Sequence, residues 1–214
     1  MAITRLGLYN IACAAIGERQ LDSLTENREP RRLLDTIYTR GNGAIRYFLE
    51  CGLWNHAMRT IKIEEDASVT PSFGLTYAFS KPSDFVRLNQ MSANEHFYDP
   101  LNEYEDEGGY WYADVNPLYI RYVSDHADYG ADLSLWPESF SLWAGHWLAT
   151  QIAPTLKNDI DMERLEKRTK DLLMKAQSLD AQNEPARFPP RGSWVRARGG
   201  RGGGDRGSRS TLIG

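Results

Sequence analysis

The sequence is poor in cysteine and in long apolar runs. Its 214 residues include two cysteines, Cys13 and Cys51, which fall on separate predicted helices. We therefore expect two buried, reduced thiols rather than a disulfide, which fits synthesis in a bacterial cytoplasm. No apolar run approaches the roughly 20 residues that span a bilayer, so we predict no membrane segment. The N-terminus also lacks the basic segment, apolar core and cleavage site of a signal peptide.

Catalytic motifs are missing as well. The sequence contains four histidines, His56, His96, His126 and His146, and no two of them have the spacing of a metal-binding pair. The glycine-rich stretch 199–204 lacks the Gly-Lys-Ser/Thr ending of a phosphate-binding loop. There is no Gly-x-Ser-x-Gly elbow, and the acidic group Glu103–Glu107 has no calcium-loop pattern, which favours a solvated loop. We therefore predict that the protein is not an enzyme and has no catalytic residue, metal or cofactor.

Charge is unevenly distributed along the chain. Residues Arg187–Gly214 contain seven Arg and one acidic residue, Asp205, so this segment carries +6. The net charge of the chain is −4, which leaves −10 on the rest. From Glu184 onward the composition is dominated by Pro, Gly, Arg and Ser. Because so little apolar surface cannot offset the entropy of ordering, we expect a disordered C-terminal tail in the free monomer.

The apolar pattern predicts four helices. The first spans Ile3–Ile16 and ends at Gly17. The second begins near Asn27 and is expected to continue through Gly41–Gly43, because its apolar register survives across that gap. The third follows Ser134–Pro137 and carries a broad apolar stripe, wide enough to face more than one neighbour, that includes Trp136, Trp143 and Trp147. Pro154 is expected to kink or end it, and a fourth helix begins near Asn158.

Between the second and third helices the pattern predicts strands. Phe73 to Ser80 alternates in apolar character, Lys81–Asp84 has turn chemistry, and Phe85–Met91 resumes as a second apolar-rich run. We also predict a strand at Ala57–Glu64, a long hairpin loop over Glu95–Asp114 and a closing strand at Leu118–Val123. The expected fold is mainly α with a β insertion (α+β): a four-helix bundle-like domain that carries a small antiparallel sheet as a platform.

The predicted domain organisation follows from these elements. Residues 1–56 form helices 1 and 2 of a helical domain, and residues 57–125 form the β insertion. Residues 126–184 return to the helical domain as helices 3 and 4. Residues 185–214 form a flexible Pro/Arg/Gly-rich arm.

The order of several short motifs resembles the phage tail tubular protein A family of head-to-tail connector proteins. The central match is Phe73-Gly-Leu-Thr-Tyr-Ala-Phe followed by Pro82-Ser-Asp-Phe-Val-Arg87. The family usually has Leu at the position of Lys81. The resemblance covers about Leu6 to Arg198. Its signature residues here are Phe73, Tyr77, Pro82, Asp84 and Arg87.

The resemblance implies a structural virion protein at the head-tail junction. Such a protein forms a homo-oligomeric ring of roughly twelve subunits between the portal protein and a tail nozzle protein of the tail tubular B type. DNA passes through the channel without sequence-specific binding, and no membrane is involved. The family's C-terminal segment contacts neighbours during assembly. The corresponding candidate contact residues are Arg187, Arg191, Trp194, Arg196 and Arg198.

The tail leaves alternatives open. Arg198-Gly-Gly and Arg201-Gly-Gly resemble an RGG box, which binds nucleic acid through phosphate charge and stacking, and Trp194 could stack on a base. The alternative function is thus a single-stranded nucleic-acid-binding protein. The tail could instead dock on a neighbouring protein or have no specific role. The sequence beyond Gly199 departs from the family pattern.

Overall fold

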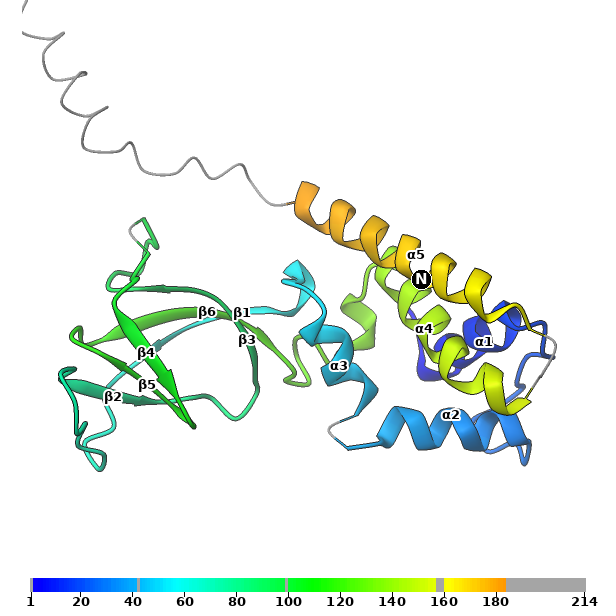
Figure 1. Cartoon of the computed structure of the whole chain (residues 1–214), viewed down its shortest axis with the longest axis horizontal. Helices are drawn as coiled ribbons and strands as arrows, with labels where there is room; N and C mark the ends of the chain where they lie inside the picture. The colour runs from blue at the N-terminus through cyan, green and yellow to red at the C-terminus, as the bar shows by residue number, and fades with distance from the viewer. Residues whose placement is uncertain (1, 42, 99, 157–159, 184–214) are drawn as a thin grey trace, which may run out of the picture. The chain divides into compact units, whose positions relative to one another are not determined.

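The computed structural model describes residues 2–41, 43–98, 100–156 and 160–183. Five α-helices lie in these ranges (Figure 1): α1 (Arg5–Ala15), α2 (Glu29–Thr39), α3 (Ala44–Glu50), α4 (Glu138–Leu156) and α5 (Met162–Gln182). Short 3-10 helices span Asn55–Ala57 and Leu133–Leu135. Met1–Glu184 forms one compact unit. No described helix is long and apolar enough to cross a membrane.

Helix α4 is the centre of the helical part and packs against α1, α2 and α5 (Figure 1). Most of its apolar stripe is buried, with Trp143 2% exposed and Leu148 fully covered, while Trp147 is partly exposed. Gly145 permits the close approach of α1, because a Cβ at this position would come within 2.4 Å of the Ile11 side chain. The described helices therefore share one apolar core, to which α3 adds Phe48.

The predicted continuous helix through Gly41–Gly43 is wrong. Helix α2 ends at Thr39 and α3 begins at Ala44, with Gly41 at φ +60° and Gly43 at φ +86°. Right-handed helix requires negative φ, and glycine adopts positive φ without the Cβ clash that penalises other residues. Two helices with compatible apolar faces pack into the same core here, which is why their register looked continuous.

Within the described ranges, six strands form two three-stranded antiparallel sheets. Sheet A has the order β1-β6-β3, and sheet B has the order β2-β5-β4. The strands are β1 (Met58–Ile63), β2 (Tyr77–Ser80), β3 (Phe85–Ser92), β4 (Tyr104–Glu107), β5 (Tyr110–Ala113) and β6 (Leu118–Ser124). The facing sides enclose a second core that includes Phe79, Trp111 and Tyr122.

The signature segment is not a hairpin. A turn lies at the predicted place, with the Phe85 N–H donating to the Pro82 carbonyl at 3.0 Å. The strands on either side nevertheless belong to different sheets, since β2 pairs with β5 and β3 pairs with β6. The strand before the turn begins at Tyr77 rather than Phe73, which is 40% exposed. The turn therefore carries the chain from sheet B to sheet A.

The predicted fold class is wrong in the number of helices and sheets and in the proportion of helix to strand. The five helices do not form a four-helix bundle-like domain, and two sheets replace the single small one. The structure is a mixed α+β fold. Part of the discrepancy comes from the predicted acidic loop, because Tyr104–Glu107 is strand β4 and pairs with β5 around Gly108, at φ +59°. Likewise β6 lies in the middle of sheet A and does not close its edge.

The last two helices depart from the prediction at their ends. Pro154 lies inside α4, which continues to Leu156. Helix α5 begins at Met162 after an Asp161 cap, whose carboxylate accepts the Arg164 N–H. Near the end of α5 the Leu179 side chain is 41% exposed. The C-terminal tail and its arm residues lie outside the described residues. The described members of both apolar cores lie within the compact unit Met1–Glu184.

The break between α2 and α3 gives a stability prediction. Gly41→Ala should destabilise the protein by about 1 kcal/mol, because the position has open space but requires positive φ. Gly74→Ala is the matched control, since its Cβ also meets open space and its φ is not in the left-handed region. Urea unfolding of the two variants measures the difference. Equal stabilities would contradict the left-handed turn at Gly41.

Candidate functional site

The carboxylate of Asp84 lies at the turn between the two sheets and is 8% exposed. It accepts hydrogen bonds from the Tyr122 hydroxyl at 3.0 and 3.1 Å and from the Ser124 hydroxyl. It also forms an ion pair with the Arg59 guanidinium at 2.7 Å. These partners come from β1 and β6, so one carboxylate joins two strands of sheet A to the turn that enters its third strand.

Protonation states at this cluster follow from its surroundings. Burial alone would raise the pKa of Asp84, but the hydrogen bonds from Ser124, Arg59 and Tyr122 outweigh it and hold that pKa below its ordinary value. Burial and the adjacent carboxylate raise the pKa of the Tyr122 hydroxyl. The carboxylate is therefore ionised and the hydroxyl protonated at neutral pH. This arrangement suits a structural tie better than proton transfer.

A second set of contacts continues from this cluster to α3. The Arg46 guanidinium forms an ion pair with Asp125 at 2.6 Å and donates to the Phe85 carbonyl at 2.7 Å. The Asp125 N–H in turn donates to the Asp84 carbonyl at 3.1 Å. Polar contacts thus run without interruption from α3 through the turn to β1, and we call this set the Asp84 network.

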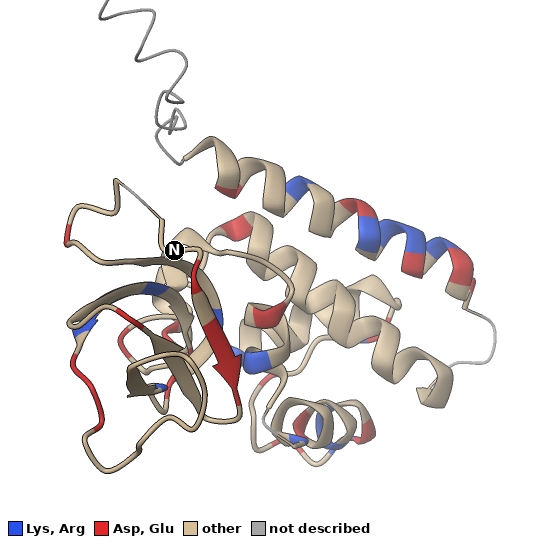
Figure 2. Cartoon of the chain, turned by 60° about the vertical axis from the view of Figure 1, so that its left-hand side comes forward, with Lys and Arg blue, Asp and Glu red and all other residues tan. Residues whose placement is uncertain are grey.

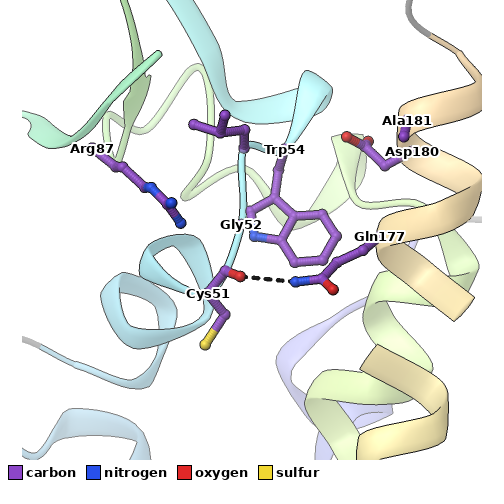
Figure 3. A pocket seen from close by; sticks show the side chains of 8 residues that line it. Cys51, Gly52, Trp54, Arg87, Gln177, Asp180 and Ala181 are labelled. Carbon is purple, nitrogen blue, oxygen red and sulfur yellow. Dashed lines mark hydrogen bonds between the residues drawn. The ribbon is translucent and has the colours of Figure 1, made fainter. Parts of the chain in front are cut away.

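At the C-terminal end of α3 lies a cleft of about 480 Å³ (Figure 3). Residues from three places line it: the loop after α3, strand β3 and the last turns of α5. Trp54 forms part of its wall, and Arg87 and Asp180 lie at opposite sides (Figure 3). The lining residues are Cys51, Gly52, Leu53, Trp54, Arg87, Gln177, Asp180 and Ala181.

The cleft residues satisfy the carbonyl groups at the C-terminal end of α3. The Trp54 indole donates to the Phe48 carbonyl at 2.9 Å, and the Gln177 amide donates to the Cys51 carbonyl at 3.0 Å. Arg87 donates to the Glu50 carbonyl at 3.3 Å. A helix end leaves such carbonyls without partners inside the helix, and a cation there also suits the helix dipole. The cleft therefore terminates α3 and attaches it to β3 and α5.

Asp180 holds the end of α5 in place. Its carboxylate accepts the Asn55 backbone N–H at 3.1 Å, and its backbone carbonyl accepts the Asn55 side-chain amide at 2.8 Å. Sequence reasoning missed this role. The available signal was position, because Asp180 continues the spacing of the buried residues Leu172 and Ala176 on α5.

The chemistry of the cleft is limited. Burial raises the pKa of the Cys51 thiol, which therefore stays protonated at neutral pH. No group of three His, Cys, Asp or Glu side chains in the described ranges could hold a metal ion. Cys13 is buried and Cys51 partly buried, and both are free thiols. The cleft therefore offers binding contacts only: the apolar surface of Trp54 and the exposed guanidinium of Arg87.

His56 is a separate feature of the junction between helices and sheet. Its ring contacts Phe140 at a centroid distance of 4.7 Å, with Trp54 and Trp136 at 6.3 and 6.4 Å. Both ring nitrogens are buried and have no hydrogen-bond partner among the described residues. Burial lowers the pKa of His56 to about 4. The neutral ring is thus an orphaned polar group in an aromatic cluster.

The structure separates the predicted signature residues by role. Asp84 is buried in the Asp84 network, and Arg87 lies exposed on the cleft. Tyr77 opens β2 and packs on the second core, and Pro82 accepts the turn hydrogen bond. Phe73 lies on the other face of sheet B, against Tyr112. The candidate arm residues lie outside the described part of the chain.

Comparison with known proteins supplies no family for this chain. No protein-family model matches it, and no curated protein matches its sequence.

A comparison of Arg59 with Arg87 gives a stability prediction for the Asp84 network. Arg59→Ala should destabilise the protein by about 2–3 kcal/mol, because it leaves a buried carboxylate with one partner fewer. Arg87→Ala, which removes one exposed 3.3 Å contact, should cost about 0.5 kcal/mol. Chemical unfolding at neutral pH measures both. If both variants lose a similar amount of unfolding free energy, the Asp84 network does not contribute more to stability than the Arg87 contact with α3.

His56 gives a prediction of pH dependence. Its pKa is lowered from 6.5 to about 4, so the unfolded chain binds a proton that the folded chain does not between those values. Stability should therefore fall by about 3 kcal/mol from this group as the pH drops through that window. His56→Leu should reduce this acid sensitivity, whereas His96→Leu, at an exposed side chain, should leave it unchanged. Urea midpoints between pH 7 and 4.5 provide the measurement, and parallel profiles for wild type and His56→Leu would refute the assignment.

Proposed function

We propose that this protein is a structural virion protein, a head-to-tail adaptor that forms a ring between the portal and the tail nozzle. The proposal starts from the ordered motifs that resemble the tail tubular protein A family. The observation that carries it is the use made of Asp84 and Arg87, three positions apart in the signature. The Asp84 side chain ties the turn to strands β1 and β6 of sheet A, and the Arg87 side chain ties β3 to the end of α3.

A connector needs such ties because it passes force between two neighbours without changing shape. Arg46 to Asp125 and Arg87 to Glu50 join the helical part to sheet A, and Asn55 to Asp180 ties the end of α5 to the 3-10 helix that precedes β1. Several of these are charge-assisted, and such hydrogen bonds are roughly twice as strong as neutral ones. The arrangement supports a rigid adaptor and offers no reactive group at the same place.

The charge of the chain also supports the proposal. Outside the Arg-rich segment 187–214 the chain carries −10. A channel rich in Lys and Arg would retain DNA by releasing counterions, whereas an acidic wall allows it to pass. A ring of acidic bodies through which DNA slides is consistent with this charge.

Electron microscopy of the purified chain, alone and with the portal protein of the same virus, tests the proposal. We expect rings of about twelve copies seated on the portal, in keeping with closed cyclic symmetry. Binding to a single-stranded oligonucleotide is measured in parallel at two salt concentrations. Monomers that ignore the portal but bind the oligonucleotide with a steep salt dependence would instead identify a single-stranded nucleic-acid-binding protein.

A further inference from the structure

The outer face of sheet B carries aromatic and acidic side chains. In the antiparallel register Ala78, Tyr112 and Glu105 share one face, as do Ser80, Tyr110 and Glu107. The alternate residues Phe79 and Trp111 point the other way, into the second core. We call the surface formed by Phe73, Tyr110, Tyr112, Glu105 and Glu107 the aromatic face.

The rings of this face form one connected group. Phe73 packs edge-on against Tyr112 with centroids 4.9 Å apart, and Tyr110 lies 6.4 Å from Tyr112. Phe73 is 40% exposed although it is a large apolar residue, and both tyrosines are partly exposed. An exposed aromatic group of this kind is typical of a surface that another chain covers.

The charge of the face has a single sign. Glu105 and Glu107 are exposed on the edge strand β4, which Figure 2 shows as an acidic strand, and neither forms an ion pair with a described residue. Strands β2, β4 and β5 contain no Lys or Arg. Lys81, which directly follows β2, pairs with Asp106, whose side chain belongs to the opposite face. A partner for this face would therefore need positive charge and an affinity for aromatic rings.

Arginine has both properties. Its guanidinium stacks on tyrosine and phenylalanine rings and pairs with carboxylates at the same time. The richest source of arginine in this sequence is Arg187–Arg209, with seven arginines and one acidic residue. Glycines separate several of these arginines, which allows the backbone to approach a flat surface closely.

We propose that the Arg-rich segment 187–209 of one copy docks on the aromatic face of a second copy. Its guanidinium groups stack on Tyr110 and Tyr112 and pair with Glu105 and Glu107. The docking proposal rests on the proposed function because it requires that several copies of the chain lie side by side in one assembly. It adds the identity of the surface that receives the arm.

The first experiment uses two pieces of the chain. A fluorescent peptide of residues 185–214 is titrated with residues 1–184, which contain both apolar cores. We expect saturable binding that weakens with salt. The double variant Glu105→Gln/Glu107→Gln should bind about fivefold or more weakly. The control Glu163→Gln/Glu166→Gln removes the same charge from α5 and should bind within about twofold of the wild type. Equal losses in both variants would show unspecific charge attraction and overturn the proposal, as would a peptide that does not bind.

A second peptide separates stacking from charge. With every Arg replaced by Lys the charge is unchanged, but a flat guanidinium no longer lies on the rings. We expect binding about threefold or more weaker, and equal affinity would contradict the stacking.

A third measurement uses the full chain and distinguishes a second copy from the same copy. Sedimentation over a range of concentrations should show self-association that Glu105→Gln/Glu107→Gln reduces. If the variant changes nothing at any concentration, the segment does not bridge copies and the proposal fails. These outcomes are independent of ring formation on the portal, so failure here leaves the adaptor proposal standing, and failure there leaves the peptide result interpretable.

Discussion

A buried carboxylate at a turn between two sheets is the constraint on which the rest of the structure depends. Asp84 lies where the chain leaves sheet B and enters sheet A, and its oxygens are occupied by Arg59, Tyr122 and Ser124. A carboxylate this well buried is stable only when its hydrogen bonds are made, and removal of a partner costs several times the net value of an ordinary hydrogen bond. The path of the turn is therefore set by charge pairing as well as by apolar packing.

Helices and sheets are coupled through the same region. Arg46 extends the Asp84 network into α3, and the C-terminal end of α3 is held by Gln177 of α5 and Arg87 of β3. Helix α3 has only seven residues and would not be stable alone, since isolated helices of that length do not form in water. Its place comes from Phe48 in the core and from side chains that satisfy its C-terminal carbonyls. A short helix anchored in this way links sheet A to the rest of the helical part.

Acidic and basic residues are concentrated in different parts of the chain. The sheet edge at β4 is acidic, the outer side of α5 mixes both signs (Figure 2), and the strongest positive charge in the sequence lies in residues 187–209. An acidic edge strand also discourages pairing with the edge of another sheet. An acidic body with a basic arm can associate with copies of itself while its body repels nucleic acid. This combination is the physical basis for the ring proposed above.

What the sequence determined by itself is local. The amphipathic spacing of α1, the apolar run of α4, the turn after Lys81 and the alternation of β1 and β6 all depend on neighbours within a few residues, so their patterns predicted them. The tertiary structure decided the rest. Gly41 and Gly43 could lie in a helix by register, and only the packing of α2 and α3 shows that positive φ is required. Strand partners depend on residues far apart in the chain, so β2 and β3 looked like a hairpin although each pairs with a later strand. The same holds for Asp84 and Asp180: their burial depends on partners 25 to 125 residues away, and no local pattern contains that information.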